Sequence, residues 1–198
     1  MPEPPVELSS EEARVLGALL EKEAATPEYY PLTLNSLRTA CNQTSSRDPV
    51  VSYDDATVEA ALSSLREKGL VRVVHSPSNR ALKYRQVLPE ALAQQRALER
   101  EDLAVVCLLL LRGPQTSGEL RNRADRLARF ESVEEVEAVL ARLGQGDAPL
   151  VTRMERMPGQ KEARFAQLLT GADPGRAALE AEARMLRTRL AEIEELLR

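Results

Sequence analysis

Aromatic residues and glycine are scarce in this sequence. Its 198 residues include two Phe, four Tyr, no Trp and nine Gly. A hydrophobic core must therefore be built from Leu, Val and Ala, a composition that favours helices over a β-sandwich or a β-barrel. The length suits one large domain or two small ones, each with enough chain for its own core.

Histidine and cysteine are almost absent, which excludes several kinds of chemistry. One His and two Cys cannot form a four-ligand zinc centre or a disulfide framework. The chain also has no Gly-x-Ser-x-Gly motif and no glycine-rich phosphate loop. We therefore expect no metal, no cofactor and no enzymatic activity. Cys41 and Cys107 are expected to be buried small side chains in a reducing compartment.

Long apolar segments are absent as well. The longest apolar run, Leu103 to Leu111, has nine residues, about half of what a membrane-spanning helix needs. The start of the chain, Met1-Pro-Glu-Pro-Pro, lacks the basic and apolar segments of a secretion signal. These features predict a cytoplasmic protein without a membrane partner.

What the sequence does contain is an order of elements that occurs twice. Helical spacing of apolar residues predicts three helices over about 9–26, 32–41 and 54–68, followed by a hairpin over about 70–87. The same order returns about 80 residues later: Val58-Glu-Ala-Ala-Leu62 matches Val136-Glu-Ala-Val-Leu140, and Lys83-Tyr84 matches Arg164-Phe165. The sequence predicts a mainly α protein with small β-hairpins (α+β), in which residues 8–88 and 102–170 form two tandem winged-helix domains.

Two further helices are predicted outside the repeat. Residues 89–101 begin with proline and contain strong helix formers, which predicts a connecting helix between the domains. Residues 176–198 carry a short heptad pattern that predicts a coiled coil and a homodimer. The alternative for this helix is packing against its own chain. The predicted seam consists of Leu179, Ala183, Leu186, Leu190, Ile193 and Leu197.

Four longer strings resemble a known family. They are Thr26 to Asn35, Ala40 to Pro49, Arg112 to Arg121 and Pro158 to Phe165. These strings are similar to the YceH-like family of uncharacterised bacterial proteins, and the likeness extends from Leu8 to Thr170. The resemblance implies a tandem winged-helix fold and brings no activity, ligand or catalytic residue with it.

A winged helix often places its third helix in the major groove and its hairpin, the wing, against phosphate. The net charge of −4 excludes a broad cationic surface, yet the segment 70–88 has four cations and no acid. Strand alternation predicts Leu82 and Tyr84 toward the core and Lys83 and Arg85 outward. The alternative is that these cations belong to ordinary solvated surfaces. The candidate nucleic-acid contacts are Arg72, Arg80, Lys83, Arg85, Arg121, Arg123, Arg153, Arg156, Lys161 and Arg164.

The predicted third helices begin with acidic residues, which argues against reading of bases in the major groove. Carboxylates are repelled by the phosphates that flank a recognition helix, although they also stabilise helix N-termini. The first helix begins with Asp54, Asp55 and Glu59, and the second with Glu131, Glu134, Glu135 and Glu137.

Two functions follow from these opposing patterns. One is a DNA-associated transcriptional regulator that contacts phosphate through basic wings. The other is a protein-interaction scaffold that uses winged-helix surfaces without binding DNA. The polar loop 42–49 fits either function, and it also fits a loop whose side chains satisfy its own backbone.

Overall fold

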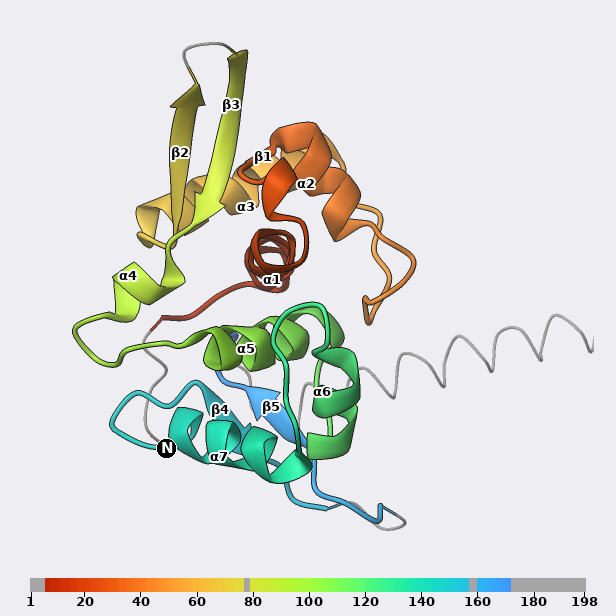
Figure 1. The fold of residues 1–198 in the computed structure, drawn as a ribbon. Helices are drawn as coiled ribbons and strands as arrows, with labels where there is room; N and C mark the ends of the chain where they lie inside the picture. Colours follow the sequence, from red (N-terminus) through yellow and green to blue (C-terminus); the bar gives the residue numbers. More distant parts are fainter. Residues whose placement is uncertain (1–5, 77–78, 157–159, 172–198) are drawn as a thin grey trace, which may run out of the picture.

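A computed structural model describes residues 6–76, 79–156 and 160–171 of the chain. Within these residues the chain is mixed α+β and mostly helical, with seven α-helices and two small antiparallel sheets (Figure 1). None of the helices in these ranges is long and apolar enough to cross a membrane. The predicted helix 176–198, with its six seam residues, lies outside the described residues.

The first half of the chain contains the helices and the hairpin that the sequence predicts. Ser9 begins the first helix through a capping box with Glu12, because each side chain accepts a hydrogen bond from the other residue's backbone N–H. Thr33 and Asp54 cap the next two α-helices, where the side-chain oxygen of each accepts from the backbone N–H three residues on. The elements are α1 (Ser10–Ala25), η1 (Pro27–Tyr29), β1 (Leu32–Thr33), α2 (Leu34–Cys41), α3 (Asp55–Glu67), β2 (Val71–Ser76) and β3 (Asn79–Gln86).

The second half repeats this order. Phe165 forms an isolated antiparallel bridge with Gln115, where the first half pairs Tyr84 with Leu32, so the predicted correspondence of the two aromatic residues is confirmed. The third helix of this half begins at Ser132, whose hydroxyl accepts from Glu135 N–H. The elements are α5 (Arg100–Arg112), α6 (Ser117–Arg123), α7 (Val133–Leu143), β4 (Val151–Arg153) and β5 (Phe165–Gln167).

The prediction of one connecting helix over residues 89–101 is wrong. α4 (Leu88–Leu92) covers only the start of this segment, and the chain then runs without a helix until α5 begins at Arg100. Tertiary contacts outweigh the helical propensity of this segment. The Arg96 guanidinium donates to the carbonyl of Leu143, the last residue of α7, and to those of Gln145 and Ala148 just beyond it, at 3.2, 2.8 and 3.0 Å. Its position after α4 is therefore set by the second half of the protein.

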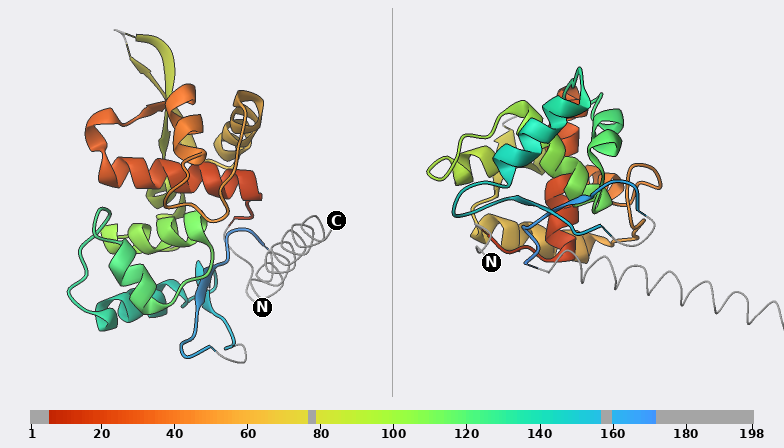
Figure 2. Two further views of the ribbon diagram at one scale, coloured as in Figure 1. Left: turned by 90° about the vertical axis from the view of Figure 1, so that its right-hand side faces the viewer. Right: turned by 90° about the horizontal axis from the view of Figure 1, so that it is seen from below.

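α1 and α5 form the centre of the molecule and pack against each other (Figures 1 and 2). Every residue of 12–20 in α1 and of 104–111 in α5 is buried, as is typical of helices enclosed on all sides. The helices approach closely at Gly17, where a Cβ atom would lie 2.9 Å from Leu111 Cδ2 and 3.1 Å from Leu110 Cβ. Both halves consequently share one continuous hydrophobic core.

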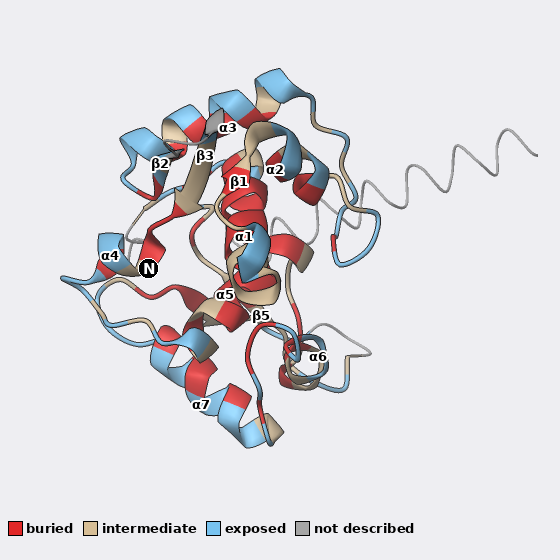
Figure 3. Cartoon of the chain, turned by 45° about the horizontal axis from the view of Figure 1, so that its top comes forward, coloured by how far each residue is buried: buried red, intermediate tan, exposed pale blue. Residues whose placement is uncertain are grey.

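The two hairpins extend from opposite ends of this core. β2–β3 is at the top of Figure 1 and β4–β5 is in the lower part, with α1 and α5 between them. The outer faces of α3 and α7 are exposed, whereas α1 and α5 are mostly buried (Figure 3). The fold thus presents each hairpin and each third helix on its own side of the buried helix pair.

Candidate nucleic-acid interface

The β2–β3 hairpin aligns three cations on one of its sides. Arg72 is the cross-strand partner of Arg85, and Val74 is the partner of Lys83. Directly opposed residues and residues two apart on a strand share a side of the sheet, so Arg72, Lys83 and Arg85 lie together. Two like charges placed directly opposite each other destabilise a hairpin, and an anion bound between them removes that cost.

Little negative charge lies near this cationic row. Arg85 Nη1 is 3.1 Å from Glu90 Oε1, in a pair between a half-buried arginine and an exposed glutamate. Arg72 is exposed and Lys83 half-buried, and neither forms an ion pair with any residue that the structure describes. The structure describes the backbone of Arg80, which lies in β3, but not its side chain. The hairpin therefore offers at least two cations to an outside anion.

On the other side of the hairpin, one of the two predicted core residues is not buried in the core. Tyr84 packs against the core as predicted, but Leu82 is 46% exposed. Strand alternation places both residues on the same side, yet β2–β3 extends beyond the helices (Figure 1), and Leu82 is not buried in the core.

The β4–β5 hairpin carries cations in a different arrangement. Arg153, Arg156 and Lys161 are exposed and line a cavity of about 880 Å³ between this hairpin, α7 and the start of α6. Within the described ranges none of the three forms an ion pair. Glu137 and Glu162 line the same cavity and reduce its positive potential. This hairpin is therefore a weaker anion site than β2–β3.

The remaining candidate arginines have partners inside the protein. Arg164 Nη1 donates to Pro114 O at 2.6 Å and lies 3.3 Å from Glu119 Oε2. Arg121 donates to Glu131 O at 2.9 Å, and Arg123 donates to Gln115 Oε1 at 2.7 Å. These three side chains hold α6 and β5 in place.

The outer faces of the third helices are acidic, as the sequence analysis describes. Arg66 is the one exposed cation within α3 and Arg142 the one within α7. Hydrogen bonds from Thr57 lower the pKa of the Asp54 carboxyl, so this cap stays charged. The exposed carboxylates are Asp55, Glu59 and Glu67 on α3 and Glu134, Glu135 and Glu137 on α7.

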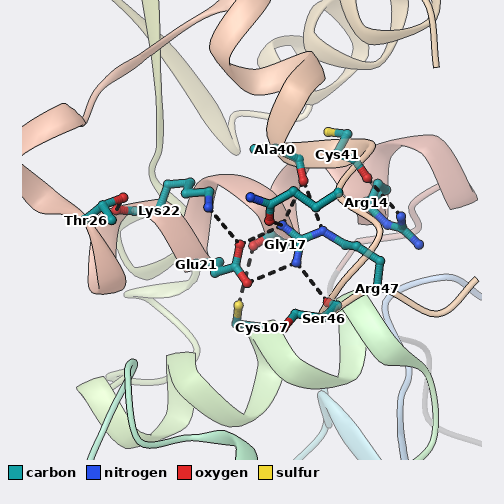
Figure 4. A network of polar contacts seen from close by, with 11 residues as sticks. Arg14, Gly17, Glu21, Lys22, Thr26, Ala40, Cys41, Ser46, Arg47 and Cys107 are labelled. Carbon is teal, nitrogen blue, oxygen red and sulfur yellow. Dashed lines mark hydrogen bonds and ion pairs between the residues drawn. The ribbon is translucent and has the colours of Figure 1, made fainter. Parts of the chain in front are cut away.

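Arg47 in the polar loop has a structural role that the sequence analysis did not assign (Figure 4). Its buried guanidinium lies 2.6 Å from Glu21 Oε2 and donates to the carbonyls of Ala40 and Ser46. Burial raises the pKa of Glu21, but the hydrogen bonds and charge of Arg47 outweigh it and lower this pKa below its usual value. No local pattern signals this pair, because its two residues are 26 positions apart.

Asn42 likewise satisfies the backbone of the loop. Its side-chain amide donates to Tyr53 O and accepts from Tyr53 N–H, both at 2.8 Å. Asn42 and Arg47 therefore match the alternative in which the loop stabilises itself. Gln43, Thr44 and Ser45 line a shallow polar hollow beside α2.

The prediction that both cysteines are buried is confirmed. Burial raises the pKa of the Cys41 thiol to about 12 and also raises that of the Cys107 thiol. The Cys107 thiol donates to Gly17 O at 3.4 Å, across the contact between α1 and α5. Across the part of the chain that the structure describes, no three His, Cys, Asp or Glu side chains are grouped as metal ligands.

Comparison with known proteins gives one family. The family described as "Protein of unknown function, DUF480" matches residues 8–160. The chain is 55% identical over 165 residues to a UPF0502 protein of Geobacter metallireducens, covering 83% of this chain and 73% of the relative. It is 52% identical over 171 residues to a UPF0502 protein of Opitutus terrae, covering 86% and 73%. The chain therefore belongs to the DUF480 family of bacterial proteins, together with these UPF0502 proteins.

Proposed function

We propose that residues 8–88 and 102–170 are two winged-helix domains and that the protein is a non-enzymatic, DNA-associated regulator. In this proposal the hairpins contact the phosphate backbone. The supporting observation is the opposed pair Arg72 and Arg85 with Lys83 beside it, on a hairpin that extends beyond the body.

Contact through the hairpins accounts for the distribution of charge. Phosphate contacts depend on cations alone and carry no base sequence, so the acidic third helices need not enter the groove. Each phosphate contact adds about 0.9 to the slope of log K against log salt concentration, and the three cations of β2–β3 therefore contribute a slope of about 2.7. DNA binding should consequently be modest, strongly salt-dependent and weakly selective for sequence.

Fluorescence anisotropy with a labelled duplex over a series of salt concentrations tests this proposal. The variant Arg72→Glu with Lys83→Glu should bind more weakly, with a salt slope smaller by about 1.8, because two phosphate contacts are lost. The matched control is Arg126→Glu with Arg129→Glu, which makes the same charge change at two exposed side chains between α6 and α7. Equal loss of affinity in both variants would mean that net charge, and not the hairpin, carries binding.

The acidic outer faces of α3 and α7 support a second candidate, a protein-interaction scaffold. Substitution of the exposed Glu59 by Lys separates the two functions. For a DNA-binding protein it should raise duplex affinity, because a carboxylate that repels phosphate is replaced by a cation. For a scaffold whose partner binds the α3 face, it should leave DNA binding undetectable and release a protein that co-purifies with the native chain after nuclease treatment.

Dimerisation through residues 176–198 belongs to the same proposal. The heptad pattern supports it, because apolar residues spaced in this way form a two-stranded seam. Light scattering on the full chain should give a dimer, and Leu186→Asp with Leu190→Asp should give a monomer. A native monomer, or a dimer that survives both substitutions, would contradict this part of the proposal.

A further inference from the structure

The two hairpins point away from each other, so the cations that they carry are far apart on the molecule. β2–β3 and β4–β5 lie at opposite ends in Figure 1, and the quarter-turn view at the left of Figure 2 preserves that separation. Arg72 and Lys83 are at one end, and Arg153, Arg156 and Lys161 are at the other. The two groups of cations are thus separated by the buried pair α1 and α5.

The halves are also held too firmly to turn both hairpins toward one side. α1 and α5 contribute to one continuous core, and backbone hydrogen bonds also join the two halves. Asp48 N–H donates to Leu111 O at 2.9 Å, and Leu8 N–H donates to Leu169 O at 2.6 Å. A rotation of one half would expose the buried faces of α1 and α5 to water.

A single duplex is too stiff to follow the surface from one hairpin to the other. Layers of packed helices are about 8–10 Å apart, so the stack of α3, α1, α5 and α7 is about 30 Å thick between its outer helix axes. The persistence length of DNA is about 500 Å, and reversal of its direction around such a body is strongly unfavourable. Two separate segments meet no such barrier.

We propose that the protein bridges two DNA segments, with one duplex bound at each hairpin. This inference rests on the proposed function, in which the hairpins contact phosphate. The β2–β3 row of cations is the stronger contact and supplies most of the affinity for a single duplex. The β4–β5 contact uses Arg153, Arg156 and Lys161, and the cavity beside them leaves room for a phosphate strand. Glu137 and Glu162 in that cavity make it the weaker contact.

A capture assay with the full chain tests the bridge. One duplex is immobilised on beads, and a fluorescent second duplex is supplied in solution with increasing amounts of protein. Retained fluorescence should rise and then fall, because excess protein occupies each duplex separately. Anisotropy with the fluorescent duplex alone measures simple binding in parallel, and circular dichroism verifies that every variant is folded.

The reference is the chain with Leu186→Asp and Leu190→Asp, which cannot dimerise through residues 176–198 and therefore carries a single β2–β3 hairpin. The decisive variant adds Arg153→Glu and Lys161→Glu to this chain. It should reduce capture about tenfold but lower affinity for a single duplex by about threefold or less, because the stronger hairpin is unchanged. The charge-matched control, which adds Arg126→Glu and Arg129→Glu to the same chain, should capture the second duplex like the reference.

The failures of the two proposals are distinguishable. Capture by the decisive variant equal to that of the reference would overturn the bridge while DNA binding stands, since the β4–β5 cations would then not hold the second segment. Single-duplex binding without any capture by the reference would overturn the bridge as well. No binding in anisotropy would overturn the proposed function and, with it, the bridge.

Discussion

Substitution of Gly17 by Ala measures the close packing of α1 against α5. In an open helix this change stabilises a protein by about 1 kcal/mol, because Ala has the higher helical propensity. At Gly17 the added Cβ would lie 2.9 Å from Leu111 Cδ2 and 3.1 Å from Leu110 Cβ. Both leucines are buried, with exposures of 1% and 8%, and have little space into which to move.

Overpacking of a tight core costs about 1–3 kcal/mol. With the gain in propensity subtracted, Gly17→Ala should lower the free energy of unfolding by about 1 kcal/mol. Gly118→Ala is the matched control, because the nearest atom to its Cβ would be Thr116 Oγ1 at 4.0 Å. That variant should gain a few tenths to about 1 kcal/mol, so the same chemical change has opposite signs at the two sites.

Urea denaturation followed by circular dichroism provides the measurement, with midpoints compared at equal m-values. The two variants should differ by about 1.5–2 kcal/mol, or about 4–7 °C in Tm for a chain of this size. Equal stabilisation by both substitutions would refute the close approach of α1 and α5. It would also remove the rigid contact on which the bridging inference depends.

Three further predictions concern side chains inside the fold. Glu21→Gln should cost about 3 kcal/mol near neutral pH, because it leaves the Arg47 charge buried without its partner. Because folding lowers the pKa of Glu21, the difference in free energy of unfolding between the native protein and Glu21→Gln has its full size above about pH 4.5. It disappears as the pH falls through the folded-state pKa, as denaturation at several pH values should show. Arg96→Ala should cost about 1–3 kcal/mol, because it leaves carbonyls beyond α7 without their hydrogen-bond donor. Arg129→Ala, which removes an exposed ion pair, should change stability by less than about 0.5 kcal/mol. Labelling of Cys41 and Cys107 with iodoacetamide should proceed at the rate of global unfolding, and fast labelling in the native state would contradict their burial.

Much of the local structure could be predicted because its causes are local. Ser9 and Glu12 are three residues apart and define the start of α1 by themselves. The match between Lys83-Tyr84 and Arg164-Phe165 located the returning strand in both halves. Alternation along β3 also placed Lys83 and Arg85 on one side correctly.

The candidate interface was predictable only in part, because burial and hydrogen-bond partners depend on residues outside the local sequence pattern. Arg121, Arg123 and Arg164 have the same sequence character as Arg153 and Arg156, yet they donate to acceptors inside the protein. Leu82 follows the alternation of a core residue and is exposed because its hairpin extends beyond the helices. Arg47 is buried because Glu21 and the Ala40 carbonyl converge on it from distant positions.

By itself, the sequence determined the helices, their caps, the two hairpins and the repeated order, since hydrophobic periodicity and capping act within a few residues. The tertiary structure alone decided that residues 93–99 leave the helix for the contacts of Arg96, and that α1 and α5 pack at Gly17. It also decided that the hairpins point apart. These features depend on shape complementarity between segments about 50 to 90 residues apart, and no local pattern encodes such a fit.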